Sequence, residues 1–166
     1  MTSLHLFLVL SIFSLAFTAN QKRTVIITGA NRGIGLAATR QLAISGKWNI
    51  VMACRNKELA EAARSTINGK ENCQVVELDL ANLDSVKKFV KNFDGELHCL
   101  ACNAGIQLSA GTGNAKGTAQ YTVNGFERTI GTNHIGHMAL LQGLLPYLQK
   151  TPESRIVIVG SSLINI

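Results

Sequence analysis

The segment TVIITGANRGIGLA, residues 24–37, constrains the fold more than any other part of this 166-residue chain. A run of β-branched residues ends at Gly29, and Gly33 and Gly35 follow before small and apolar residues resume. β-Branched runs favour strands, and glycine tolerates the positive φ angles of a tight turn. We therefore predict a buried strand that passes through a glycine-rich turn directly into a helix.

Beyond this turn, strand-like apolar runs alternate with helix-like segments. Strands are predicted at 24–28, 48–54, 73–80, 97–102 and 155–160, and helices at 33–45, 56–67, 84–93 and 125–149, the last bent or ended near Pro146. Such alternation forms right-handed βαβ units and a parallel sheet, and continuously apolar strands are covered on both faces. We expect a three-layer α/β fold with a doubly wound, Rossmann-like parallel sheet of order 3-2-1-4-5.

Composition agrees with one globular domain. Hydrophobic residues make up 46% of the chain and charged residues 16%, and the length suits a single core. The net charge of +6 is basic, which is a property of many nucleic-acid-binding proteins. The lysines and arginines are spread along the sequence without a run of four, however, so we expect no nucleic-acid partner.

The first 21 residues contain no Asp, Glu, Lys or Arg. Within them, residues 6–17 form an apolar run that is too short to cross a bilayer comfortably. Such a run is typical of the core of a signal peptide, and residues 14–16 (Ser-Leu-Ala) provide a cleavage site with small residues at both ends.

This leader has two other interpretations. It can be an uncleaved anchor at the membrane surface, held there by Lys22 and Arg23. Alternatively, its Ala-Phe junction at 16–17 resembles the start of the bipartite plastid signals of algae with secondary plastids. We expect 1–21 to be a signal or targeting segment for the secretory pathway and endoplasmic reticulum, with the plastid as the alternative. Residues 22–166 are expected to form an incomplete NADP-binding domain.

The four cysteines do not resemble a disulfide framework. Cys54, Cys73, Cys99 and Cys102 each fall in or beside a predicted strand, where cysteine acts as a small hydrophobic residue. Cys99 and Cys102 have the spacing of a redox motif, but residues three apart in a strand point to opposite faces. We expect four free thiols.

The glycine turn occupies the place of the phosphate site in dinucleotide-binding folds. Without side chains at Gly29, Gly33 and Gly35, the backbone can approach a pyrophosphate, which the free N–H groups at the helix start would bind. The spacing G-x-x-x-G-x-G differs from G-x-G-x-x-G, and no Gly-Lys-Ser/Thr of a P-loop follows. A turn that merely packs a helix closely against a strand remains the alternative.

Arginine residues favour a phosphorylated dinucleotide. Arg55 stands twenty residues beyond Gly35, at the end of the second strand, where NAD sites place an acid for the ribose hydroxyl. An arginine there suits a 2′-phosphate, and Arg32 in the glycine turn could join it. The alternative interpretation is that Arg32 and Arg55 are ordinary surface residues that bind no cofactor. Asp79 and the segment 103–105 follow the third and fourth strands at the same ligand-binding edge.

Several motifs together resemble the short-chain dehydrogenase/reductase family. They are TGANRGIG at 28–35, DL at 79–80, NAG at 103–105, TNHIGH at 132–137 and RIVIVGSS at 155–162, so the resemblance extends over residues 24–162. The segments GKWNIVMACRN, LDLANLDSVKKFV and NGFERTIGTNHIGHM are similar to light-dependent protochlorophyllide reductases. Retinol-dehydrogenase-like members share much of the third segment.

The resemblance implies a set of cofactor-binding residues. The glycine turn would hold the pyrophosphate and ribose, the two arginines would select NADP, two residues would flank adenine, and three would line the other ribose. In chain order, these residues are Thr28, Gly29, Asn31, Arg32, Gly33, Ile34, Gly35, Arg55, Asp79, Leu80, Asn103, Ala104 and Gly105.

The resemblance also implies two catalytic residues. Asn133 would organise a proton-relay water, and Ser161 would position the substrate carbonyl or the proton donor, with Ser162 as the alternative in register. From the residues alone, these can equally be a polar helix residue and a strand-end cap. His134 and His137 have metal-ligand spacing on a helix, but no third ligand is apparent, so we expect no metal.

The family's catalytic Tyr-x-x-x-Lys pair has no match in the chain. The two tyrosines are Tyr121 and Tyr147, and Gly125 and Thr151 stand four residues after them. We therefore expect a C-terminally truncated member that lacks the last strands and is inactive alone, because that tyrosine transfers the proton. The strand at 155–160 would then be an exposed apolar edge.

Four functional hypotheses are compared. The first is an NADP(H)-dependent short-chain oxidoreductase similar to protochlorophyllide reductase, represented by its cofactor-binding portion. The alternatives are a non-catalytic nucleotide-binding product and a retinol-dehydrogenase-like enzyme. The fourth, an S-adenosylmethionine methyltransferase, would need an acid at the end of the second strand to bind the ribose hydroxyls. Arg55 stands there instead, so we reject this function. The expected substrate is a small carbonyl, alcohol or tetrapyrrole; membrane-surface association and a homo-oligomer stay open.

Overall fold

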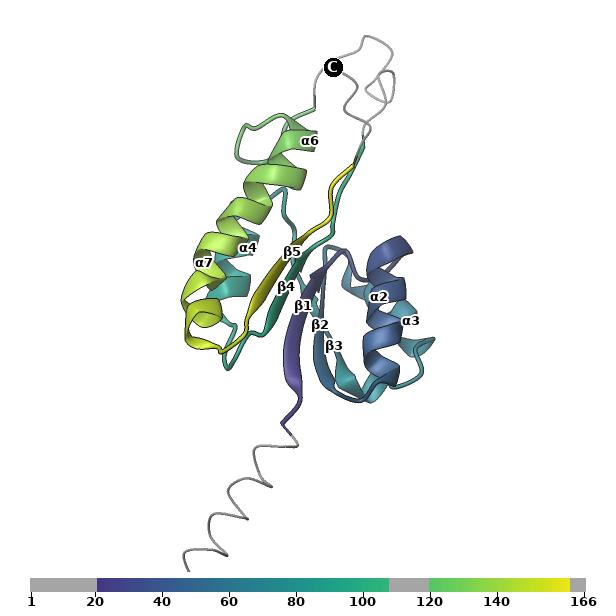
Figure 1. Cartoon of the computed structure of the whole chain (residues 1–166). Coiled ribbons are helices and arrows are strands. Elements are labelled where there is room, and N and C mark those ends of the chain that lie inside the picture. Colours follow the sequence, from purple (N-terminus) through teal and green to yellow (C-terminus); the bar gives the residue numbers. More distant parts are fainter. Residues whose placement is uncertain (1–20, 108–119, 162–166) are drawn as a thin grey trace, which may run out of the picture.

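The computed structural model describes residues 21–107 and 120–161. Five parallel strands form one sheet of order β3-β2-β1-β4-β5, which confirms the predicted α/β topology (Figure 1). The strands are β1 (Arg23–Thr28), β2 (Trp48–Cys54), β3 (Cys73–Glu77), β4 (Cys99–Cys102) and β5 (Arg155–Ile158).

Helices cover both faces of the sheet (Figure 1). The helices α2 (Gly33–Ile44) and α3 (Lys57–Ser65) lie on one face, and α4 (Leu83–Lys91) and α7 (Gly136–Lys150) lie on the other. Strands β1 to β4 supply both cores with alternate residues: Ile27 packs toward α2, whereas Ile26 packs toward α7 and its buried Leu140 and Leu144. This is the layered arrangement that continuously apolar strands require.

Asparagine caps fix the starts of two helices. The Asn56 side chain accepts a hydrogen bond from the Leu59 N–H at 2.7 Å, as predicted for the cap of α3. The Asn82 side chain caps α4 by accepting hydrogen bonds from the N–H groups of Asp84 and Ser85. This helix begins one residue before the predicted range. The third strand is shorter than predicted: β3 ends at Glu77, and the chain then turns toward the carboxyl edge of the sheet.

The long helix predicted over 125–149 is divided into three parts. A short α6 (Arg128–Ile130) leads into a π-helical turn, η2 (Gly131–Ile135), and then into α7. The Glu127 carboxylate caps the start by accepting two backbone hydrogen bonds from residues 129 and 130, and these bonds lower its pKa. Pro146 does not end the helix, which continues to Lys150 because buried leucines on both sides of the proline anchor the last turns.

The cysteines are free thiols, as predicted. Cys99 packs with the core under α2 and Cys102 with the core under α7, so the two point to opposite faces of β4. Burial raises the pKa of Cys102 to about 11. The neutral thiol therefore behaves as an apolar core group.

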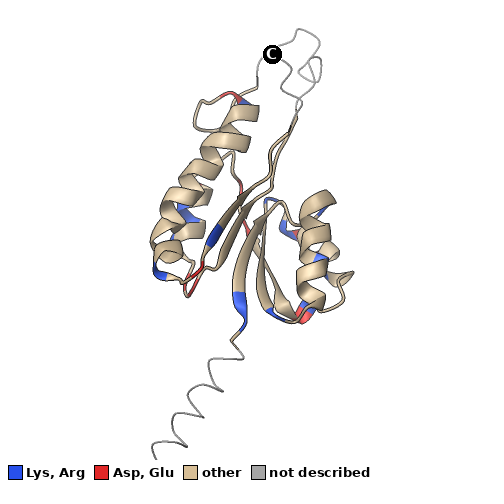
Figure 2. Ribbon diagram, in the orientation of Figure 1, with Lys and Arg blue, Asp and Glu red and all other residues tan. Residues whose placement is uncertain are grey.

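The predicted targeting segment lies almost entirely outside the described residues, as do Ser162 and residues 108–119 of the loop after β4. Within the described ranges, no helix is long and apolar enough to cross a membrane. Lysine and arginine are scattered over both helical layers and the strands rather than gathered in one stripe (Figure 2).

The outer edge strand β5 is apolar and exposed, as predicted. Ile156, Val157, Ile158 and Val159 all remain accessible, and Ile158 is 73% exposed. An apolar edge strand can pair with another chain through its backbone groups, so self-association of the 166-residue chain is expected at this strand.

Replacing Ile158 with lysine is expected to reduce concentration-dependent self-association, because a charge on an edge strand opposes strand pairing. The free energy of unfolding should change by less than about 0.5 kcal/mol, since the side chain is exposed. Sedimentation velocity over a concentration series measures the effect. Ile44→Lys, which replaces an equally exposed isoleucine on α2, is the control; an equal reduction there would contradict a role for the edge.

Candidate functional site

Residues that follow all five strands surround one pocket, which we call the carboxyl-edge pocket. Its volume is about 560 Å³, within the range of small-molecule sites. It lies where the sheet order reverses between β1 and β4, the position at which open α/β sheets bind ligands. The lining residues are Gly29, Asn31, Arg32, Gly33, Ile34, Ala53, Arg55, Asn56, Leu59, Leu78, Asp79, Leu80, Asn103, Ala104, Gly105, Ile106, Thr132 and Val159.

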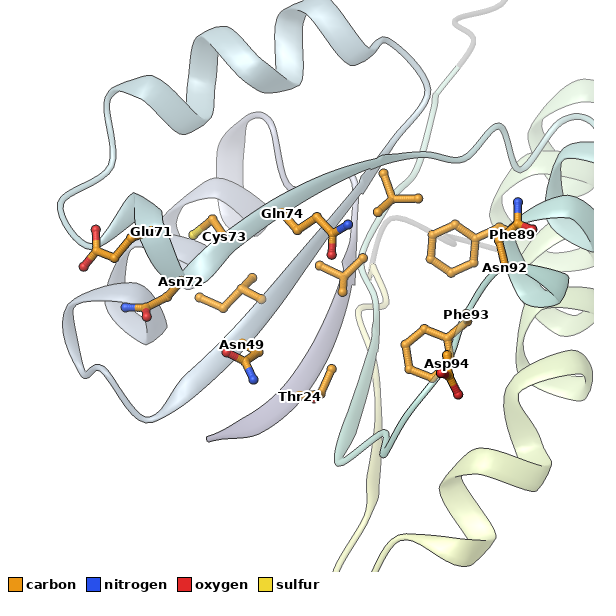
Figure 3. A pocket seen from close by; sticks show the side chains of 13 residues that line it. Thr24, Asn49, Glu71, Asn72, Cys73, Gln74, Phe89, Asn92, Phe93 and Asp94 are labelled. Carbon is orange, nitrogen blue, oxygen red and sulfur yellow. The ribbon is translucent and has the colours of Figure 1, made fainter. Parts of the chain in front are cut away.

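A second pocket, of about 520 Å³, lies at the opposite, amino-terminal edge of the sheet. The rings of Phe89 and Phe93, from α4 and the turn after it, lie across from strand side chains such as Asn49 (Figure 3). Its lining includes the acids Glu71 and Asp94 but neither lysine nor arginine, and no α-helix of the described residues begins there. Anionic ligands therefore favour the carboxyl-edge pocket.

The glycine turn presents the start of α2 to the carboxyl-edge pocket. Gly29 and Gly33 have φ angles of +65° and +53°, which a residue with a side chain rarely adopts. The N-cap Arg32 is extended, its side chain makes no capping bond, and the first turn holds no acid. The free N–H groups and the positive end of the helix dipole are therefore available to an anion.

Gly35, a predicted cofactor residue, does not line the pocket. A Cβ at this position would lie 2.5 Å from the Gly29 carbonyl oxygen and 2.5 Å from the Asn103 side-chain nitrogen. The residue is glycine because α2 packs directly against the turn and against the segment after β4. Its contribution to the site is this close packing.

Thr28, also predicted to bind the cofactor, does not line the pocket either. The residue is completely buried, and its hydroxyl oxygen accepts hydrogen bonds from the N–H groups of Asn103 and Ala104, both at 2.9 Å. The Asn103 side chain in turn donates to the Thr28 carbonyl at 2.8 Å. Thr28 thus fixes the wall after β4 to the end of β1.

The two arginines predicted to select a 2′-phosphate both line the pocket. Arg32 comes from the glycine turn and Arg55 from the end of β2, and both are exposed. In the part of the chain that the structure describes, no carboxylate forms an ion pair with either guanidinium. Both groups can therefore bind an external anion bidentately.

Asp79 and Leu80 line the pocket beyond the end of β3. One Asp79 carboxylate oxygen accepts the Ala81 N–H at 2.9 Å, and the Asp79 N–H donates to the Ser85 hydroxyl at 3.0 Å. These bonds hold the short turn between β3 and α4. The remaining carboxylate oxygen is left to a ligand.

The two predicted catalytic residues do not line the pocket. The Asn133 side chain, on the π-helical turn, bonds the backbone of Ile106 twice: it accepts from the N–H and donates to the carbonyl, both at 2.8 Å. Ser161 is exposed beyond the end of β5, where Val159 lines the pocket instead.

Sequence reasoning missed several lining residues. Asn56 is the N-cap of α3 and Leu59 lies in its first turn. Because this cap directly follows β2, its position in the sequence could have predicted that both residues lie at the carboxyl edge of the sheet. Thr132 comes from the π-helical turn, whose register no periodicity indicates. Its hydroxyl is the one buried side-chain polar atom without a hydrogen-bond partner among the described residues.

The paired histidines have no third ligand nearby. Among the residues that the structure describes, no three His, Cys, Asp or Glu side chains are grouped to hold a metal ion. His137 is 8% exposed, and its ring nitrogens lie 2.9 Å from the Thr28 hydroxyl and 3.0 Å from the Asn133 carbonyl oxygen. Burial is the main cause that lowers the pKa of His137, and the nearby charge of His134 adds to it.

Acid is expected to destabilise the fold partly through His137. Because its pKa is lower in the folded chain, the unfolded chain binds the proton first, so stability is full above the ordinary value of 6.5 and falls as pH drops below it. Urea unfolding between about pH 8 and about pH 5 measures this loss. His137→Gln should lose less stability over the same interval; equal losses would contradict a contribution from His137.

Comparison with known proteins agrees with this geometry. The family model of the short chain dehydrogenases matches residues 23–164. The chain is 46% identical over 147 residues to the chloroplastic protochlorophyllide reductase of Daucus carota and 47% identical to that of Cucumis sativus, each covering 85% of this chain. A crystal structure of an uncharacterized Mycobacterium Paratuberculosis protein superposes with a TM-score of 0.66 at 42% identity, over 76% of this chain and 43% of the other.

The chain spans about a third of the length of these curated relatives, 36% in both cases. The family match nevertheless includes every described strand and helix, from β1 to β5. It also includes the whole lining of the carboxyl-edge pocket. The chain therefore belongs to the short-chain dehydrogenase/reductase family.

Proposed function

We propose that this chain is the NADP(H)-binding portion of a short-chain oxidoreductase that reduces a tetrapyrrole of the protochlorophyllide type. One observation carries the cofactor assignment: Arg32 and Arg55, both without an acidic partner in the described residues, line the same pocket as the glycine turn. Relatives named protochlorophyllide reductase support the substrate class.

The residues of the carboxyl-edge pocket fit the parts of NADP(H). The N–H groups at the start of α2 would bind the pyrophosphate, and Arg32 with Arg55 would bind the 2′-phosphate. Asp79 and Leu80 would flank the adenine, and residues 103–105 would line the second ribose. When bound, NADPH supplies the hydride for reduction.

Two further residues belong to the proposed reaction. Asn133 would hold the π-helical turn against Ile106 and so place a proton-relay water, and Ser161 would position the substrate or its proton donor. Neither Tyr121 nor Tyr147 has a lysine four residues later. We therefore expect this 166-residue chain to bind the cofactor without turning over substrate.

The plastid is the proposed location. The relatives from carrot and cucumber are named chloroplastic, which favours the bipartite plastid interpretation of the leader over the secretory one. Association with a second copy or with a membrane surface would involve exposed apolar residues, of which α7 offers Met138 and Leu145.

Fluorescence titration of the 166-residue chain with NADPH and with NADH tests the cofactor assignment. We expect NADPH to bind more tightly, because only it carries the phosphate for the two arginines. The proposal is contradicted if NADH binds more tightly than NADPH, or if neither nucleotide binds. Illumination with protochlorophyllide, and a parallel assay with retinal, tests the second part: turnover by this chain alone would contradict the need for the Tyr-x-x-x-Lys pair.

A further inference from the structure

His137 lies on α7 within hydrogen-bond distance of Thr28, does not line the carboxyl-edge pocket, and has no role in the proposed function. Its imidazole is almost fully buried, which is costly for a polar ring unless both nitrogens are hydrogen-bonded. Both are: one nitrogen, Nε2, meets the Thr28 hydroxyl and the other, Nδ1, meets the Asn133 carbonyl oxygen. The ring thus joins the first strand to the π-helical turn.

The partners of His137 fix its tautomer. The Asn133 carbonyl oxygen can only accept, so Nδ1 must carry the hydrogen. A neutral ring then has a bare Nε2, which accepts the single hydrogen of the Thr28 hydroxyl at 2.9 Å. The competing acceptor, the Ala101 carbonyl oxygen, lies farther away at 3.3 Å.

This tautomer determines where the lone pairs of the Thr28 hydroxyl point. With its hydrogen directed at His137, the oxygen keeps two lone pairs, and these match the N–H groups of Asn103 and Ala104. The opposite tautomer would direct a third donor at the same oxygen, which has no lone pair left for it. One backbone N–H of the pocket wall would then lose its partner.

We propose that His137 is a positioning residue for cofactor binding: through the Thr28 hydroxyl, its Nδ1–H tautomer holds the backbone of Asn103 and Ala104 in the shape of the pocket wall. The inference rests on the proposed NADP(H) site. His137 touches no ligand itself and acts only through Thr28.

NADPH titration of four variants and one control variant tests the proposal. His137→Leu should weaken binding about tenfold, the effect of one lost buried hydrogen bond, and Thr28→Val should weaken it at least as much. The double variant should bind as Thr28→Val does, because His137 acts through that hydroxyl. His137→Gln, whose amide oxygen can accept near the Nε2 position, should restore most of the affinity. His134→Leu, an exposed histidine on the preceding turn, is the control.

Unfolding curves of each variant separate a loss of binding from a loss of fold. If His137→Leu does not fold, the NADPH affinity of His137→Gln and the tautomer of His137 in the wild-type chain still test the proposal. The ¹⁵N spectrum of the ligand-free wild-type chain should show His137, assigned by its disappearance in His137→Gln, as the Nδ1–H tautomer. The Nε2–H tautomer, wild-type affinity in folded His137→Leu, or additive losses in the double variant would each overturn the proposal.

The spectrum needs no cofactor, so it also separates two kinds of failure. If the wild-type chain binds no NADPH, the proposed function is wrong. The tautomer measurement then still shows whether His137 holds the Thr28 hydroxyl as described.

Discussion

Arg55→Ala is expected to weaken NADPH binding about 10- to 100-fold while leaving NADH binding nearly unchanged. A hydrogen bond between charged groups contributes about 1.5–3 kcal/mol, and 1.4 kcal/mol corresponds to a factor of ten. Arg55 lines the carboxyl-edge pocket at the end of β2, has no carboxylate partner in the described residues, and would meet the 2′-phosphate that NADH lacks.

Titrations of both nucleotides at low and high salt measure this effect, because exposed charge pairs are screened by salt. Arg40→Ala is the matched control: Arg40 is exposed on α2, donates to the Thr66 hydroxyl and does not line the pocket. An equal loss for both nucleotides in Arg55→Ala would show that the arginine does not read the phosphate. Arg32→Ala should repeat the pattern.

Gly35→Ala is expected to destroy most of the NADPH affinity, by at least tenfold, and to destabilise the fold by about 1–3 kcal/mol. Alanine normally stabilises a helix relative to glycine by about 1 kcal/mol. Here the added Cβ would lie 2.5 Å from the Gly29 carbonyl oxygen, and a backbone atom cannot move aside as a side chain can. The helix must shift away from the turn, which moves the N–H groups that would hold the pyrophosphate.

Gly143→Ala is the control for this clash. Its Cβ would approach the Val90 side chain at 2.7 Å, between α7 and α4 and away from the pocket. The branched valine side chain has little freedom to move, so this variant should also lose stability. Its NADPH affinity should stay close to that of the wild-type chain, because Gly143 does not line the pocket. Urea unfolding and NADPH titration of both variants measure the difference; wild-type affinity in Gly35→Ala would contradict the close-packing role.

The sequence was sufficient for the topology because the apolar runs and the helix caps agree with one another. Asn56 caps α3 and Thr28 ends β1 as predicted, and the strand order is that of the predicted doubly wound fold. Boundaries were less exact: β3 stops at Glu77 because the pairing with β2 stops at Cys54, although the apolar pattern continues.

The site was predicted less evenly. Every predicted cofactor residue except Thr28 and Gly35 lines the pocket, because the residues that follow parallel strands share one edge. Thr28 is the last residue of β1 and Gly35 lies in the first turn of α2, and both are buried. A motif does not say which of its residues touch a ligand. The π-helical turn that brings Thr132 into the lining breaks the 3.6-residue period, so no pattern in the sequence could place it.

The Thr28 hydroxyl has a consequence for the order in which the protein folds. It bonds to residues 75, 76 and 109 positions away along the chain, so each contact closes a long loop and gains nothing until strand β4 and helix α7 have docked. Such contacts tend to be absent from the folding transition state. Weakening them should therefore accelerate unfolding more than it slows folding, and a bound nucleotide should lengthen the lifetime of the native state rather than hasten its formation.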